Sequence, residues 1–173
     1  LVPEWGKTRF ENERLLIERL LAAGQLQPAT KKAQALLEKA KAIVQSPGGS
    51  YQGADYDLAI AHFLLGRVLR YGGQAAPALD FQVEAQQVFE AIGERGERMA
   101  AVTLTEQADC LTALGRLDEA AEKYGKAIGR FENIEDLRSV AANKGQLATV
   151  RRMQQKYAAA LAEYQGALAI FEK

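Results

Sequence analysis

The sequence has little of the chemistry on which enzymes and metal sites depend. Its 173 residues include one cysteine, Cys110, and one histidine, His62. A single cysteine excludes a disulfide within the chain, and one cysteine with one histidine cannot make a zinc site of the usual kind. Nucleophilic triads and pairs would have only one candidate base. We therefore expect no enzyme activity, no metal and no cofactor, and structural roles for His62 and Cys110.

The sequence also lacks an excess of charge of either sign and any long hydrophobic run. Lysine plus arginine and aspartate plus glutamate each number 22, a balance that does not favour nucleic acid or a membrane surface as partner. No apolar run approaches the ~20 residues that span a bilayer, and no signal peptide is recognisable. We expect a cytoplasmic protein. Because the chain starts at Leu1 and ends within a helical pattern, we also expect a fragment of a larger, signalling or regulatory protein.

What the sequence does contain is a helical pattern. Alanine and leucine dominate, and apolar residues recur at spacings of three and four. Thr8 and Glu11 predict a capping box at the first helix. The glycines of Ser46–Asp55 lack the order of a phosphate-binding loop and predict a flexible connection. The pattern predicts eight helices, at about 9–23, 28–45, 56–71, 76–92, 98–114, 118–134, 136–153 and 157–173.

Residues around the predicted turn at Gly115 recur along the chain. Gly73 and Ala78 have the same spacing as Gly115 and Ala120, and Ala120 and Tyr124 recur once more, as alanine and tyrosine, in the last predicted helix. Two helices that approach closely need small residues at their crossing, with large residues filling the space to either side. One helix pair cannot bury its apolar face alone, so the recurrence predicts stacked helix pairs.

These residues resemble the tetratricopeptide repeat family, whose unit is a helix pair. The resemblance covers about residues 59–173, and the long helices are similar to the variant of roughly 42 residues in kinesin light chains and G-protein-signalling modulators. It implies an all-α fold, a right-handed α-solenoid of about four helix pairs forming one unit, 1–173. Matching repeats are expected at 56–92, 98–134 and 136–173. The pair 9–45 is expected to be a divergent or capping repeat, followed by the loop 46–55.

The resemblance implies that the first helix of each pair lines a concave groove in which ligands bind. Aromatic and arginine anchors with a polar surround suit peptide recognition. By position in the repeat, the groove candidates are Phe63, Arg67, Arg70, Tyr71, Glu106, Asp109, Thr149 and Arg152. The alternative for each of them is a solvated residue on a helix surface.

We therefore expect a non-catalytic scaffold that binds a protein or peptide partner, or another domain of its own chain. An alternative function is self-assembly, in which open solenoid ends stack on neighbouring copies to give a homo-oligomer. The last predicted helix favours this alternative because no following repeat covers its apolar side. The apolar residues concerned are Ala160, Leu161, Tyr164, Leu168 and Phe171.

Overall fold

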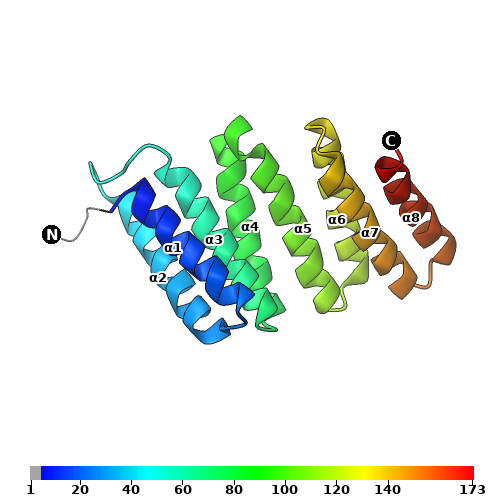
Figure 1. Ribbon diagram of the computed structural model, residues 1–173, viewed down its shortest axis with the longest axis horizontal. Coiled ribbons are helices and arrows are strands. Elements are labelled where there is room, and N and C mark those ends of the chain that lie inside the picture. Colours follow the sequence, from blue (N-terminus) through cyan, green and yellow to red (C-terminus); the bar gives the residue numbers. More distant parts are fainter. Residues whose placement is uncertain (1–4) are drawn as a thin grey trace. The chain divides into compact units, whose positions relative to one another are not determined.

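The computed structural model describes residues 5–173, which form eight α-helices, a short 3-10 helix and no strand (Figure 1). Two compact units divide the chain, residues 1–96 and 97–173. The helices of the first unit are α1 (Lys7–Ala22), α2 (Leu26–Gln45), α3 (Ala54–Tyr71) and α4 (Ala75–Ile92), followed by the 3-10 helix Glu94–Gly96. Those of the second are α5 (Glu97–Ala113), α6 (Leu117–Asn133), α7 (Leu137–Met153) and α8 (Tyr157–Phe171). The predicted eight helices are confirmed.

The first helix starts differently from the sequence prediction. It begins at Lys7 after Gly6, and no side chain caps it. The predicted capping box of Thr8 and Glu11 is therefore wrong, because Thr8 already lies inside the helix. Glu11 instead forms ion pairs with Lys7 and Arg14 along the helix surface.

Five helix ends close with the same turn, in which one residue adopts the left-handed conformation. Glycine holds this position at Gly24, Gly73 and Gly115, with φ between 72° and 79°. Glu135 and Gln155 hold it in the second unit, with φ of 56° and 61°. In each turn the next residue's backbone N–H donates to a carbonyl five residues earlier, which satisfies a helix end that lacks internal partners. The two turns without glycine have the correct shape at a steric cost.

Small residues lie where the two helices of a pair meet, as predicted. Ala108 and Ala120 are completely buried in the second unit. In the first unit Gly66 lies against the side chain of Gln82, and a Cβ on Gly66 would come within 2.7 Å of the Gln82 amide nitrogen. That nitrogen donates to the Phe63 carbonyl at 3.0 Å. Gln82 occupies the repeat position of Tyr124, so this repeat replaces an aromatic contact with a buried amide.

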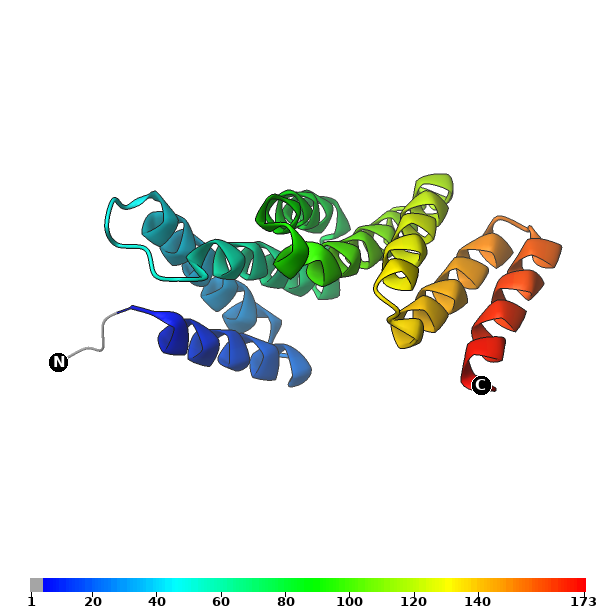
Figure 2. The same cartoon turned by 90° about the horizontal axis from the view of Figure 1, so that it is seen from above.

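The other helices of the first unit pack against α3. This helix contacts α1, α2 and α4, and Figure 2 shows α1 and α4 on opposite sides of it. Phe10 and Ile17 of α1 and Phe89 of α4 are completely buried. The rings of Tyr56 and Phe89 meet in a T-shaped arrangement with their centroids 5.3 Å apart. These buried contacts hold α1 beside α3, and the candidate site lies between these two helices.

The turn after α7 gives a test of the left-handed position. Replacing Gln155 with glycine should raise the free energy of unfolding by about 0.5–1 kcal/mol, because glycine adopts positive φ without a Cβ penalty. Urea denaturation followed by circular dichroism measures the change. The matched control is Gln146→Gly inside α7, which should lower the free energy of unfolding by a similar amount. If both substitutions changed the free energy of unfolding by the same amount and in the same direction, the steric cost at the left-handed position of Gln155 would be contradicted.

Candidate functional site

A groove of about 600 Å³ lies between α1 and α3 in the first unit. Its floor is apolar, and Glu18, Arg67 and Tyr71 are the lining residues that carry polar groups. The seven lining residues are Ile17, Glu18, Leu21, Ala22, Leu64, Arg67 and Tyr71. An apolar cleft with a few polar groups at its rim is the usual form of a binding site.

Four of the predicted groove residues lie in the C-terminal half of α3. The Arg67 guanidinium lies 4.7 Å from the centroid of the Phe63 ring, and the Arg70 guanidinium lies 4.7 Å from that of Tyr71. Cations over aromatic faces attract the ring quadrupole, so each arginine is oriented by an aromatic neighbour. Phe63 itself is only 6% exposed, and it supports Arg67 instead of offering a surface of its own. Arg67 and Tyr71 face the groove together, whereas Arg70 does not line it.

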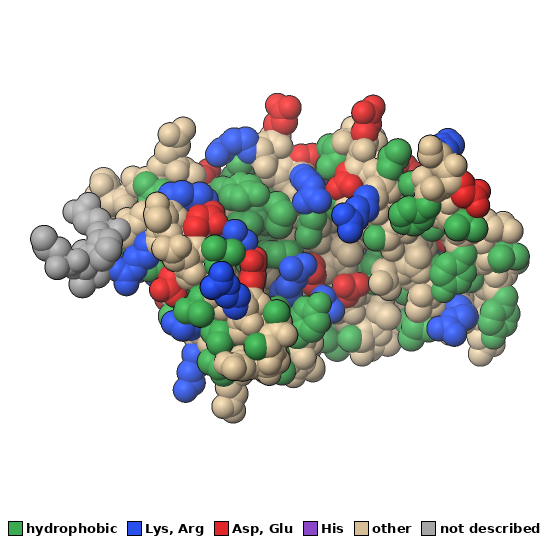
Figure 3. Space-filling view, viewed as in Figure 1, with side chains coloured by type: hydrophobic (Ala, Val, Ile, Leu, Met, Phe, Trp, Pro, Cys, Tyr) green, Lys and Arg blue, Asp and Glu red, His purple; other side chains and the backbone are tan. Residues whose placement is uncertain are grey.

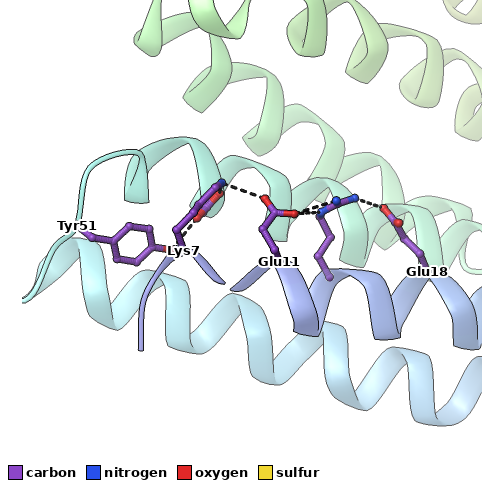
Figure 4. Close-up of polar contacts among 6 residues, drawn as sticks. Lys7, Glu11, Glu18 and Tyr51 are labelled. Carbon is purple, nitrogen blue, oxygen red and sulfur yellow. Dashed lines mark hydrogen bonds and ion pairs between the residues drawn. The ribbon is translucent and has the colours of Figure 1, made fainter. Parts of the chain in front are cut away.

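A polar network along α1 connects this groove to a buried carboxylate (Figure 4). Glu18 accepts from Arg14 at 2.7 Å, and Arg14 also donates to Glu11 at 2.9 Å. Lys7 contacts Glu11 at 3.1 Å and Asp57 of α3 at 2.5 Å. Although burial opposes these charged forms, hydrogen bonds and opposite charges raise the pKa values of Lys7 and Arg14 and lower that of Glu11. The network joins the N-terminal half of α1 to α3.

The buried end of this network also orders the connection between α2 and α3. Asp57 is 1% exposed and accepts a second hydrogen bond, at 2.7 Å, from the Tyr51 hydroxyl. Burial and the contact with Asp57 raise the pKa of Tyr51 above its usual value. The prediction of a merely flexible connection at Ser46–Asp55 therefore needs correction. Tyr51 is tied to α3, and the helix itself begins at Ala54, within the predicted loop.

The remaining predicted residues belong to α5 and α7 of the second unit. Glu106 is 4% exposed, so little of it faces solvent. Asp109 accepts a hydrogen bond from the Tyr124 hydroxyl, and Thr149 donates to the Gly145 carbonyl at 3.2 Å. Arg152 is exposed at the end of α7. The predicted set is thus divided between two units, and Arg67 and Tyr71 are its members that line the groove between α1 and α3.

Sequence reasoning missed the contribution of α1 to the groove. Ile17, Glu18 and Leu21 line it, whereas all the predicted groove residues lie in the three repeats that match the family best. The sequence signal that could have found these three residues is the position of α1 as the first helix of its own pair. The tyrosine of the repeat was also predicted only as a filler, although its hydroxyl bonds Asp109.

The single histidine and the single cysteine both lie inside the protein. Cys110 is completely buried. His62 is 5% exposed, and its Nδ1 lies 3.2 Å from a Glu84 carboxylate oxygen without hydrogen-bond geometry. Burial lowers the pKa of His62, Glu84 opposes this shift, and Lys41 adds to it. Neither side chain reaches the groove.

The part of the chain that the structure describes holds no group of three or more histidine, cysteine, aspartate or glutamate residues placed to bind a metal ion. None of its helices combines the length and hydropathy needed to cross a membrane.

Comparison with known proteins shows which family the repeats resemble. Residues 99–173 match the family model described as "Tetratricopeptide repeat". The comparison with curated protein sequences gives no match. The predicted resemblance is confirmed, and with it the α-solenoid fold class, by solved structures that share the fold.

Three of these structures illustrate the likeness. Aspartyl phosphate phosphatase F from Bacillus subtilis has a TM-score of 0.82 at 16% identity, over 95% of this chain and 40% of that one. The apo form of RapI has a TM-score of 0.83 at 16% identity, over 99% and 58%. A Podosopora anserina putative kinesin light chain with nearly identical TPR-like repeats has a TM-score of 0.70 at 16% identity, over 95% and 72%. The chain therefore spans about half the length of the first two proteins, and at these identities the likeness concerns the fold alone.

The buried carboxylate gives a stability prediction. Asp57→Ala should lower the free energy of unfolding by about 1–3 kcal/mol, because Lys7 and Tyr51 lose their buried acceptor. Urea denaturation at neutral pH measures the effect. The control is Asp55→Ala, an exposed position two residues away with a 3.7 Å ion pair to Arg95 and a 2.8 Å hydrogen bond from the Tyr56 backbone N–H, which should change stability less than the buried carboxylate does. A similar loss in both variants would count against the buried network.

The histidine gives a pH prediction. Because folding lowers the pKa of His62, the unfolded chain binds this proton more readily, and stability falls as the pH drops through the usual histidine pKa of about 6.5. In His62→Gln, the loss of stability between pH 7 and pH 5 should be smaller than in the wild type. In Glu84→Gln it should be larger, because the carboxylate favours the protonated ring. Parallel pH profiles for all three proteins in urea titrations would contradict this.

Proposed function

We propose that this chain, whose residues 99–173 match the tetratricopeptide repeat family model, is a scaffold that binds a peptide segment of a protein partner. The observation that carries the proposal is the groove between α1 and α3, in which Arg67 and Tyr71 stand beside an apolar floor. Arginine and tyrosine are enriched among the residues that dominate binding energy in protein interfaces. The repeat fold supports the same general function.

The groove favours a ligand with one large apolar side chain and polar groups beside it. Half-buried Leu21 offers apolar surface for the side chain, above a floor that buried Ile17 and Leu64 form, and burial of such a group is worth about 1.5–3 kcal/mol. Arg67 and Glu18 can then contact the polar groups of the peptide backbone or of neighbouring residues. Because Phe63 and Arg14 already orient these two charges, little side-chain entropy is lost on binding.

Exposed and half-buried residues of α5 and α7 supply a second, separate binding surface in this proposal. Arg152 and Met153 are exposed at the end of α7. Asp109 and Thr149 stand in equivalent places on α5 and α7, each beside a tyrosine hydroxyl of the second helix of its pair. Their polar groups are therefore oriented before a ligand arrives.

We also propose a kind of partner and a cellular context for the protein. The partner is a separate protein or another domain of the same polypeptide, in a cytoplasmic signalling or regulatory context. The printed names of the similar structures, an aspartyl phosphate phosphatase and a putative kinesin light chain, support a regulatory context. The chain acts by binding and not by catalysis, since His62 is buried away from the groove. Its balanced charge supports a protein partner over nucleic acid.

Peptide selection tests the proposal. A phage-displayed random peptide library is selected on the wild-type chain, and the enriched peptides are synthesised and titrated by calorimetry. Arg67→Glu and Tyr71→Ala should each weaken binding at least about tenfold, the effect of losing roughly 1.4 kcal/mol at a dominant contact. The control Lys31→Glu changes an exposed residue of α2 outside the groove and should alter affinity little. Peptides that bind all four proteins equally would place the binding surface elsewhere.

A further inference from the structure

A second cleft, of about 490 Å³, lies between α1 and α2 of the first unit. It shares no lining residue with the groove between α1 and α3. Among the described residues that line it, three are cations and one is a carboxylate. The cations are Arg9 of α1 and Lys32 and Lys39 of α2, and the carboxylate is Glu13 of α1. We call this site the basic cleft.

Trp5, which also lines the basic cleft, holds two of the cations. The Arg9 guanidinium lies 5.3 Å from the centroid of the indole ring, and the Lys39 ammonium lies 5.6 Å from it. The ring quadrupole attracts both groups, so one cation from each of the two helices is oriented by the same aromatic side chain. The indole nitrogen is buried, and Trp5 therefore presents its ring to the cleft.

The α2 wall of the cleft places two lysines on either side of a small apolar surface. Lys32, Ala35, Leu36 and Lys39 are three or four residues apart and therefore lie on one side of the helix. Leu36 is 3% exposed, and Ala35 is exposed. The Cα atoms of the two lysines are about 10.5 Å apart along the helix. An extended peptide advances about 3.1–3.4 Å per residue, so acidic residues three positions apart match this spacing.

Positive charge is concentrated at this part of the molecule. Helix α2 contains four lysines and one glutamate, whereas the whole chain has equal numbers of basic and acidic residues. Figure 3 shows lysine and arginine side chains over the N-terminal helices. In the cleft, the Lys32 ammonium lies 3.9 Å from a Glu13 carboxylate oxygen, which is too far for a hydrogen bond. Both Lys32 and Lys39 remain open to solvent, and the cleft therefore favours a negatively charged ligand.

The cleft suits separate carboxylates better than a continuous row of phosphates. Glu13 would repel a phosphate backbone, whereas a peptide can place one carboxylate at each lysine and a neutral residue beside Glu13. The balanced charge of the whole chain also disfavours nucleic acid. We propose that the basic cleft binds an acidic segment of a protein partner. Two carboxylates of this segment contact Lys32 and Lys39, and an apolar side chain between them lies on Ala35 and Leu36.

The chain contains its own probe of this site, because Trp5 is its only tryptophan. The peptide Gly-Glu-Pro-Leu-Glu-Gly, blocked at both ends, is titrated into the full chain while tryptophan emission is recorded. The emission should change saturably, and the affinity should fall as sodium chloride is added, because salt screens the ion pairs. The matched peptide with glutamine in place of both glutamates should bind at least about tenfold more weakly. Equal affinity of the two peptides, or no saturable change up to about 5 mM acidic peptide, would overturn the proposal.

Charge reversal tests the location of the site. Lys32→Glu and Lys39→Glu should each weaken binding of the acidic peptide at least about tenfold, as measured by calorimetry. The matched control Lys31→Glu, on the same helix but outside the cleft, should change the affinity less than about twofold. Equal weakening by all three substitutions would mean a general attraction to α2 and overturn the proposal. Arg67→Glu should leave the Trp5 titration unchanged, which separates this test from that of the groove between α1 and α3.

Other anions are distinguished in the same assay. Sodium phosphate and a single-stranded thymidine oligonucleotide are each titrated in place of the peptide, and both should bind more weakly than the acidic peptide. Tighter binding of the phosphate would make the cleft a site for a small anion. Tighter binding of the oligonucleotide would make it a nucleic-acid surface, and either result would overturn the assignment to an acidic peptide.

Discussion

The rest of the structure depends on one constraint, that a helix pair can bury its apolar face only against another helix. In the second unit α7 meets this need for α6, and Ala121, Tyr124 and Phe131 are buried as a result. In the first unit α3 lies against α1, α2 and α4 together. Small residues such as Ala108 and Ala120 allow the close approach. A helix therefore has one side fixed by packing and another available for binding, and the groove between α1 and α3 is one outcome of this arrangement.

Polar contacts add to this packing and fix the orientation of particular side chains. Asp57 is a buried carboxylate that binds one group from α1 and one from the connection before α3. From Lys7 the alternating charges of α1 continue to Glu18 at the groove. The orientation of a groove residue and the anchoring of the N-terminal helix are thus parts of one network. In the second unit the hydrogen bond from Tyr124 to Asp109 has a comparable role.

Much of the fold could be predicted from the sequence because its signals are local. Glycine turns and recurring alanines determine where helices end and cross, and these predictions hold. The groove could be predicted only in part. Arg67 and Tyr71 follow from their position in the repeat, but the α1 wall comes from a pair whose sequence diverges. The bond between Lys7 and Asp57 joins two helices that are not neighbours in the chain, and no local pattern signals it. The burial of Phe63 and Glu106 likewise depends on neighbours that only the folded chain supplies.

The same long-range bond has a consequence for motion. A contact between segments so far apart in the chain forms only after the loop-closure entropy is overcome, and elements held by such contacts tend to be late in folding and early in local opening. Helix α1 is therefore the natural candidate for a separate opening unit within residues 5–96. Since α1 forms one wall of the groove, its departure would convert a cleft into a flat α3 surface. A ligand held between the two helices would shift this equilibrium towards the docked state, so the groove and the order of the N-terminal helix are thermodynamically linked.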